Sequence, residues 1–126
     1  MPNWECCDYD ITDTRDNISL LAHEFEQAKK HNAENDFGEN WMGNLMVHIG
    51  YPYKDVCKRA NGCPNARGEI VGFSIHNNDN TGMSTLSIQT ETAWSPLHDC
   101  IVQFCRFFLP DCEIESYYLV EQYEVL

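Results

Sequence analysis

Four segments of the chain alternate apolar and polar residues, which is the two-residue period of a half-buried β-strand. In the first segment, Cys7, Tyr9 and Ile11 fall on one side and Cys6, Asp8 and Asp10 on the other. Residues 77–82, Asn-Asn-Asp-Asn-Thr-Gly, favour a turn and join the second and third segments into a predicted hairpin. The predicted strands span residues 4–11, 69–76, 85–94 and 113–122.

Two other segments repeat apolar residues at the spacing of an amphipathic helix. Asp13 and Asp16 supply side-chain acceptors for the start of the first helix, and Asn32 is placed to end it. Ser95, followed by a proline, is a favourable N-cap for the second helix, and Pro110 terminates it. The two apolar stripes consist of Ile18, Leu21, Ala22, Phe25 and Ala28, and of Leu97, Ile101, Phe104, Cys105 and Phe108.

The middle of the chain has no long periodic segment. Residues 32–44 are polar and predict a loop that contains Trp41 and Met42. Residues 45–49 are apolar, but five residues do not distinguish a strand from a short helix. Residues 51–68, which include Cys57 and Cys63, predict an exposed irregular loop.

The order of the elements is strand, helix, undecided apolar element, hairpin, helix and strand. This order predicts an α+β fold of the ferredoxin-like kind, in which two helices pack on one face of an antiparallel sheet. An α+β arrangement in which residues 45–49 are helical is the alternative. The length of 126 residues suits a single domain over residues 1–126.

The charge balance narrows the classes of partner. The chain has 20 Asp and Glu against 8 Lys and Arg, a net charge of -12, which excludes a general nucleic-acid binder because phosphate contacts need surplus Lys and Arg. The sequence has no run of roughly 18 apolar residues that could cross a membrane. Its first residues are not a basic segment followed by an apolar one, as in a signal peptide. We therefore expect no membrane partner and a cytoplasmic location. The loop around Lys58 and Arg59 is basic: Lys54, Lys58, Arg59 and Arg67 against Asp55 give +3.

Cysteine and histidine spacing gives no strong catalytic or metal motif. Seven cysteines is an odd number, which argues for reduced thiols rather than a closed disulfide framework. Five residues separate Cys57 from Cys63, whereas two to four usually separate paired zinc ligands. These two cysteines are therefore weak candidates for metal ligands at most. The alternatives are a small disulfide between them or two unbonded thiols. His98 and Cys100 lie two residues apart on a helix and do not face each other as a nucleophile and base must. We therefore expect no cofactor and no catalytic residue, with Cys100, Cys105 and Cys112 as apolar fillers and His23, His31, His48 and His76 at no ligand spacing.

Exposed aromatic and charged residues predict an interface. Tyr51 and Tyr53 flank a proline in the basic loop, and tyrosine is a favoured interface residue. Glu113 and Glu115 make the last strand acidic, and the Asp-rich first strand supplies a second acidic group that would extend it if the two strands are neighbours. The candidate interface residues are Tyr51, Tyr53, Lys58, Arg59, Glu113 and Glu115.

Two local sequences resemble the YubB-like ferredoxin-like domain family, whose members are small proteins of plasmids, phages and pathogenicity islands. They are the opening Met-Pro-Asn-Trp and the run Thr-Glu-Thr-Ala-Trp-Ser-Pro at residues 90–96, within a stretch, 86–121, that is similar to the family throughout. Trp41, Gly43 and Asn44, and Cys63 near Arg67, are similar to features of relatives, but the chain lacks the family's Trp-Gly-Thr-Lys-Trp run. The resemblance implies the fold and a bacterial mobile element; it implies no activity.

These observations together predict a non-enzymatic accessory protein of a mobile element that acts through contacts with another protein. A homodimer is compatible with this interpretation. The alternative is an acidic inhibitor that mimics nucleic acid and occupies the nucleic-acid groove of a host defence or DNA-processing protein. A zinc- or thiol-dependent enzyme is the least supported class.

Overall fold

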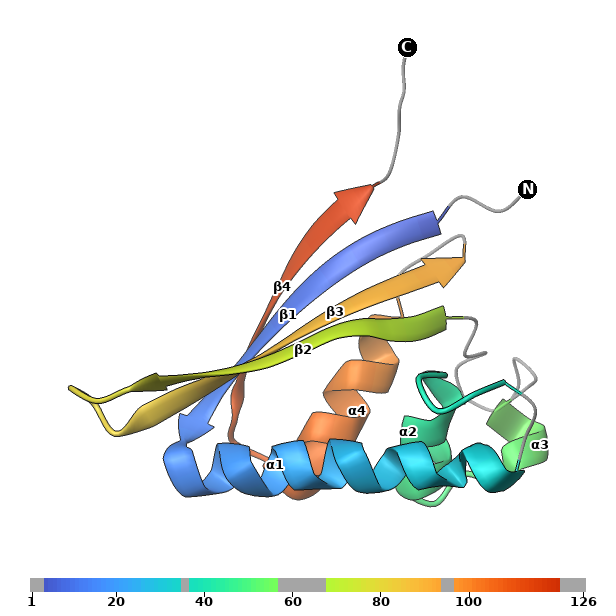
Figure 1. The fold of residues 1–126 in the computed structure, drawn as a ribbon, viewed down its shortest axis with the longest axis horizontal. Coiled ribbons are helices and arrows are strands. Elements are labelled where there is room, and N and C mark those ends of the chain that lie inside the picture. Colours follow the sequence, from blue (N-terminus) through green and yellow to red (C-terminus); the bar gives the residue numbers. More distant parts are fainter. Residues whose placement is uncertain (1–3, 35–36, 57–67, 94–96, 121–126) are drawn as a thin grey trace, which may run out of the picture.

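A four-stranded antiparallel sheet organises the chain (Figure 1). The computed structural model describes residues 4–34, 37–56, 68–93 and 97–120. The strands are β1 (Trp4–Thr14), β2 (Gly68–Asn78), β3 (Met83–Ala93) and β4 (Glu113–Val120), in the order β2-β3-β1-β4. β2 and β4 are therefore the two edge strands, and the acidic first and last strands lie side by side.

The helices lie on one face of this sheet (Figure 1). They are α1 (Arg15–Ala28), α2 (Gly43–His48), α3 (Tyr53–Val56) and α4 (His98–Phe108), and a 3-10 helix, η1 (Lys29–Glu34), continues α1. The α+β class and the antiparallel sheet are confirmed, whereas the expectation of two helices is wrong for the part of the chain described. None of the helices in that part is long and apolar enough to cross a membrane.

The core fills the space between the sheet and the helices. Tyr9 and Ile11 of β1 point into it, as their alternation predicts, together with Leu86 and Ile88 of β3. The stripe of α4 is confirmed at Ile101, Phe104 and Cys105, all buried. Phe104 packs against Phe25 of α1 with ring centroids 4.4 Å apart.

Several element boundaries differ from those predicted. β1 continues three residues past Ile11, because Thr12 and Thr14 keep their pairing with β3. The N-cap of α1 is Thr14, whose hydroxyl accepts from the Asn17 N–H at 3.3 Å, while Asp13 accepts from the Asn17 side chain. Asn32 does not end the helix, since η1 continues to Glu34.

The second long helix also begins later than predicted. α4 starts at His98 with Leu97 at its N-cap, so the cap predicted at Ser95 is wrong, and residues 94–96 themselves lie outside the described residues. The helix ends at Phe108, two residues before Pro110, as predicted.

The undecided middle segment is helical. α2 covers residues 43–48, and Leu45 and Met46 are buried against α1 and α4, so the helical alternative for residues 45–49 is confirmed. The prediction of an exposed irregular loop from residue 51 is wrong at its start, where α3 forms and Val56 is fully buried. Residues 57–67 lie outside the described residues.

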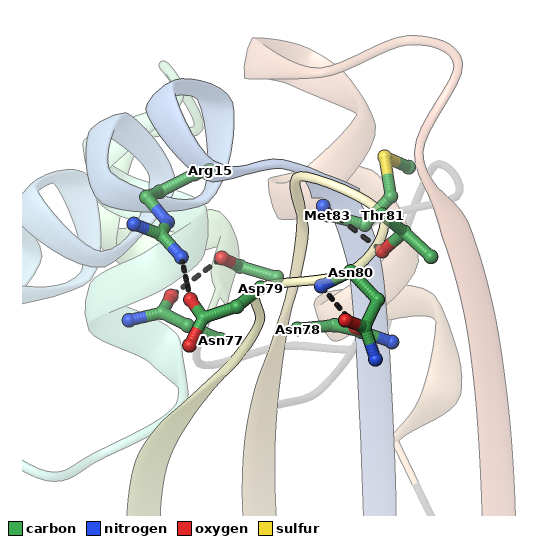
Figure 2. A network of polar contacts seen from close by, with 8 residues as sticks. Arg15, Asn77, Asn78, Asp79, Asn80, Thr81 and Met83 are labelled. Carbon is green, nitrogen blue, oxygen red and sulfur yellow. Dashed lines mark hydrogen bonds and ion pairs between the residues drawn. The ribbon is translucent and has the colours of Figure 1, made fainter.

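The β2–β3 turn is fixed by polar side chains, as its sequence predicts (Figure 2). Asn78 accepts through its side chain from the Asn80 N–H at 3.0 Å, and Thr81 accepts from the Met83 N–H at 3.2 Å. Arg15 at the start of α1 pairs with Asp79 at 2.7 Å, but both side chains are exposed, so the pair contributes little to stability. These side-chain contacts close the turn and connect it to the start of α1.

Candidate functional site

The outer edge of β2 carries backbone groups that no other segment of the described chain pairs with beyond residue 70. Backbone groups in an antiparallel strand point to alternate sides. Ile70 directs its N–H away from β3, so its partner in the register, Thr90, faces β1. Every second residue of β3 back from Thr90 also faces β1, and the β2 residues opposite them face away from β3. The β2 residues that present N–H and C=O outward are therefore Phe73, Ile75 and Asn77.

The beginning of this edge is already occupied, and the occupation supports the same alternation. Ile70 donates its N–H to the Asn40 carbonyl at 2.9 Å, and Met42 donates to the Gly68 carbonyl at 2.9 Å, which forms a bridge between Trp41 and Glu69. A bulge follows, because β2 has one residue more than β3 between Ile70 and Gly72. The unpaired edge therefore starts at the bulge and runs to the turn.

Apolar side chains accompany the unpaired edge. Phe73 and Ile75 lie opposite the buried Ile88 and Leu86, so they are on the helix-covered face of the sheet. They are nevertheless 37% and 45% exposed, and Val71 at the bulge is 53% exposed. Neighbouring strands cover apolar side chains on both flanks in the middle of a sheet, whereas here one flank is open.

A cavity of about 190 Å³ opens beside the start of this edge, between β2, α1 and the Trp41 segment. Its lining is mainly apolar, and Lys29 and Glu39 add one charged residue of each sign. Small-molecule sites usually enclose about 300–1,000 Å³, so this cavity suits an amino-acid side chain better than a metabolite. The lining includes Phe25, Lys29, Trp41, Leu45, Ile70 and Phe73.

Aromatic packing holds the Trp41 side of the cavity in place. The buried Trp41 ring stacks on Phe37 at 4.4 Å and meets Tyr53 edge-on at 6.0 Å. Asn44 is also buried and donates to the carbonyls of Gly38 and Glu39 at 3.0 and 3.1 Å, which fixes the turn before Trp41. We call the unpaired β2 backbone from residue 71 to residue 78, together with this cavity, the β2-edge site.

Gly43 is required for the Trp41 ring to lie where it does. A Cβ atom at residue 43 would overlap the Trp41 indole ring. We expect Gly43→Ala to lower the free energy of unfolding by about 1–3 kcal/mol through overpacking, although alanine is the better helix former. Urea unfolding and near-UV circular dichroism measure the loss and the displacement of the indole. An unchanged or raised stability would mean that this packing is loose.

None of the described helices covers the other face of the sheet, which is acidic. Asp8 and Asp10 of β1 point to it, and Asp10 lies directly opposite Glu115 of β4, a like-charged pair that costs stability. The sequence predicted that the acidic residues of the first and last strands would form one negative surface if these strands were neighbours. The pairing of β1 with β4 makes them neighbours. No Lys or Arg occurs in any of the four strands, so nothing within the sheet neutralises this face.

Those predicted interface residues that the structure describes do not form one surface. Tyr51 is half-buried and donates to Gln103 of α4 at 2.6 Å, so it is less exposed than predicted. Tyr53 is 38% exposed beside Trp41. Glu113 and Glu115 are exposed on β4, at the opposite edge of the sheet from β2. Lys58 and Arg59 lie outside the described residues, as do the weak metal candidates Cys57 and Cys63.

No disulfide joins two cysteines of the described residues. Cys100, Cys105 and Cys112 are buried, as predicted for apolar fillers. Burial raises the pKa of the Cys105 thiol far above its usual range and also raises the pKa of Cys112. A thiolate nucleophile is therefore disfavoured at these positions.

Two histidines that are far apart in sequence meet in the structure. His31 Nε2 lies 3.0 Å from His48 Nδ1, and His48 Nε2 lies 2.8 Å from the Glu24 carboxylate. Sequence spacing did not predict this series of hydrogen-bonded side chains, because the two histidines are 17 positions apart and lie in different helices. Within the described ranges, no group of three or more His, Cys, Asp or Glu side chains is arranged to hold a metal ion.

No protein-family model, curated protein or solved structure matches this chain. The function is therefore argued from the geometry of the β2-edge site and the acidic face.

Proposed function

We propose that this chain is a non-enzymatic protein-binding module that captures an extended segment of a partner protein along β2. The observation that carries the proposal is the unpaired β2 backbone with Phe73 and Ile75 partly exposed beside a cavity of side-chain size. In β-strand addition, main-chain hydrogen bonds supply affinity, and pockets for alternate side chains supply specificity. The β2-edge site has both parts.

The composition of β2 supports a binding role for its edge. Proteins usually protect an exposed edge with Lys, Pro, an inward-pointing charge or a β-bulge, and the bulge of β2 lies at its start, before Gly72. Between Ile70 and Asn78, β2 has no Pro and no charged Asp, Glu, Lys or Arg, although the chain carries a net charge of -12. The other edge strand, β4, carries Glu113 and Glu115. The unprotected edge is therefore the one suited to receive another strand.

We also propose that the fold is ferredoxin-like and that the protein is an accessory factor of a bacterial mobile element. The strand order β2-β3-β1-β4, with α1, α2 and α3 between β1 and β2 and α4 between β3 and β4, supports the fold. The sequence resemblance to the YubB-like family supports the setting. A small binding module suits a role exerted through protein contacts.

Selection of peptides tests the binding role. A displayed library of random extended peptides is panned against the purified protein, and the affinities of enriched peptides are measured by fluorescence anisotropy. We expect alternating apolar sequences, and at least about a tenfold loss of affinity in Ile75→Lys, since a charge is then buried beside the added strand. Ser116→Lys on β4 is the matched control and should bind normally. Equal binding by Ile75→Lys, or no enrichment, would contradict the proposal.

The acidic face supports a second candidate, a nucleic-acid mimic. Asp8 and Asp10 are two residues apart on one strand, a separation of about 6.6–6.8 Å, and Glu115 extends the row to β4. A carboxylate array of this kind attracts proteins with cationic grooves, and the attraction weakens with salt. Binding to such host proteins should fall in Asp10→Asn combined with Glu115→Gln and with added salt. Binding that is indifferent to salt would refute mimicry, and these substitutions should leave peptide affinity at β2 unchanged.

A further inference from the structure

The occupant of the β2-edge site follows from the charge and the geometry of that edge. We propose that β2 pairs antiparallel with β2 of a second copy, so that two four-stranded sheets form one continuous sheet across a two-fold axis. This inference rests on the proposed function, in which the β2 edge binds an extended strand. It names the partner as the same chain.

Charge favours a second copy at this edge over any other part of the sheet. Two copies carry -12 each and repel one another wherever their acidic surfaces meet. The open face carries Asp8 and Asp10, and β4 carries two glutamates, so contacts between copies through these surfaces would bring like charges together. The β2 edge beyond Ile70 holds no carboxylate and no cation, and it is the part of the sheet that two copies can share without that penalty.

The outward-facing residues restrict the register of this pairing, and we place the two-fold axis at Ser74. Phe73 and Ile75 present their N–H and C=O groups outward, and hydrogen-bonded pairs in an antiparallel ladder form between two such residues. A two-fold axis at Ser74 pairs Phe73 of one copy with Ile75 of the other, twice. Ser74 then lies opposite its own counterpart in a non-hydrogen-bonded pair, where Cα atoms are about 4.5 Å apart.

The occupied beginning of the edge sets the extent of the pairing. Asn40 already accepts from the Ile70 N–H, so the added strand cannot extend past the bulge. With the axis at Ser74, the ladder therefore runs from Gly72 to His76 in each copy. Within it, Phe73 and Ile75 gain a neighbour on their open flank, on the same face as Phe25, whose ring contacts Phe73 at 5.6 Å. In the dimer, β2 of each copy therefore covers the open flank of Phe73 and Ile75 in the other copy.

Cysteine cross-linking tests this register. We expect Ser74→Cys to form an intermolecular disulfide under mild oxidation, because the axis places the two residues directly opposite one another and disulfides need Cα atoms about 4.4–6.8 Å apart. His76→Cys is the matched control: it has similar exposure on the same strand and face, but faces Gly72 of the other copy. Non-reducing electrophoresis compares both with the wild type, whose own thiols set the background. Equal cross-linking of the two variants would overturn the register.

Sedimentation equilibrium over a wide concentration range tests the dimer itself. The wild type should dimerise, Ile75→Lys should weaken the dimer by at least about tenfold, and Ser116→Lys on β4 should not. Circular dichroism of each variant verifies that it is folded. A wild type that stays monomeric at all concentrations overturns the inference. If peptides still bind β2 in that case, the proposed function stands and only the identity of the partner is wrong. If Ile75→Lys alters neither the dimer nor peptide binding, the proposed function and the proposed dimer are both wrong.

Discussion

Phe104→Ala is expected to lower the free energy of unfolding by about 3–5 kcal/mol, the usual cost of removing a buried phenylalanine ring. Phe104 is fully buried in α4 and packs against Phe25 of α1 at 4.4 Å and Phe108 at 5.2 Å. The alanine variant loses both the transfer free energy of the ring and its contacts with the long helix on the same face of the sheet. Urea unfolding followed by far-UV circular dichroism measures the difference.

Phe107 provides the matched control for this substitution. It is the same residue type on the same helix, but its side chain is 60% exposed. Phe107→Ala should therefore change the free energy of unfolding by no more than about 0.5 kcal/mol, as exposed substitutions usually do. Equal losses for the two variants would mean that α4 does not present its Phe104 face to the core.

Alkaline pH is expected to destabilise the fold through its buried thiols. Burial raises the pKa of the Cys105 thiol, so the folded chain keeps a proton that the unfolded chain releases above about pH 8.5. The contribution of Cys105 is therefore complete below that pH and declines above it, by about 1.4 kcal/mol per pH unit. Burial also raises the pKa of Tyr9, whose phenol should add to the decline above about pH 10.

Urea unfolding of the reduced protein at increasing pH measures this decline. Cys105→Ala removes the titrating thiol, and its stability should fall less steeply above about pH 8.5 than that of the wild type. The comparison concerns the slope against pH, so the small cavity left by the substitution does not affect it. Identical slopes would show that the thiol does not remain protonated in the folded chain.

Local sequence patterns were sufficient to predict an element that is long and has one buried face. The alternation around Tyr9 predicted β1, and the stripe through Phe104 predicted α4, because burial on one face imposes a period that the sequence must follow. Boundaries were less accurate. β1 continues beyond Ile11 because its pairing with β3 continues, and such pairing has no local signature.

Short segments were decided by their contacts. Residues 45–49 are too few for either period, and the packing of Leu45 and Met46 against α1 and α4 makes them helical. Tyr51 was predicted as an exposed interface residue because it lies among polar and basic residues. Its hydroxyl instead bonds to Gln103, 52 residues away in the chain, which no local pattern indicates.

The candidate site depends still more on long-range pairing. The sequence predicted a strand containing Phe73 and Ile75, but whether a strand lies at an edge depends on which strands pair with it. The cavity beside β2 requires the bridge between Trp41 and Glu69, and the acidic face requires Asp10 opposite Glu115. Each of these contacts joins residues that are too far apart in the sequence for a local pattern to connect them.

By itself, the sequence determined the α+β class, the main strands and long helices, the apolar cysteines and the acidic character, because each is a local or compositional property. The tertiary structure alone decided which strand is an unpaired edge, where the negative charge collects and which side chains surround the cavity. Those properties depend on strand order and helix packing, which are set by the burial of apolar surface across the whole chain.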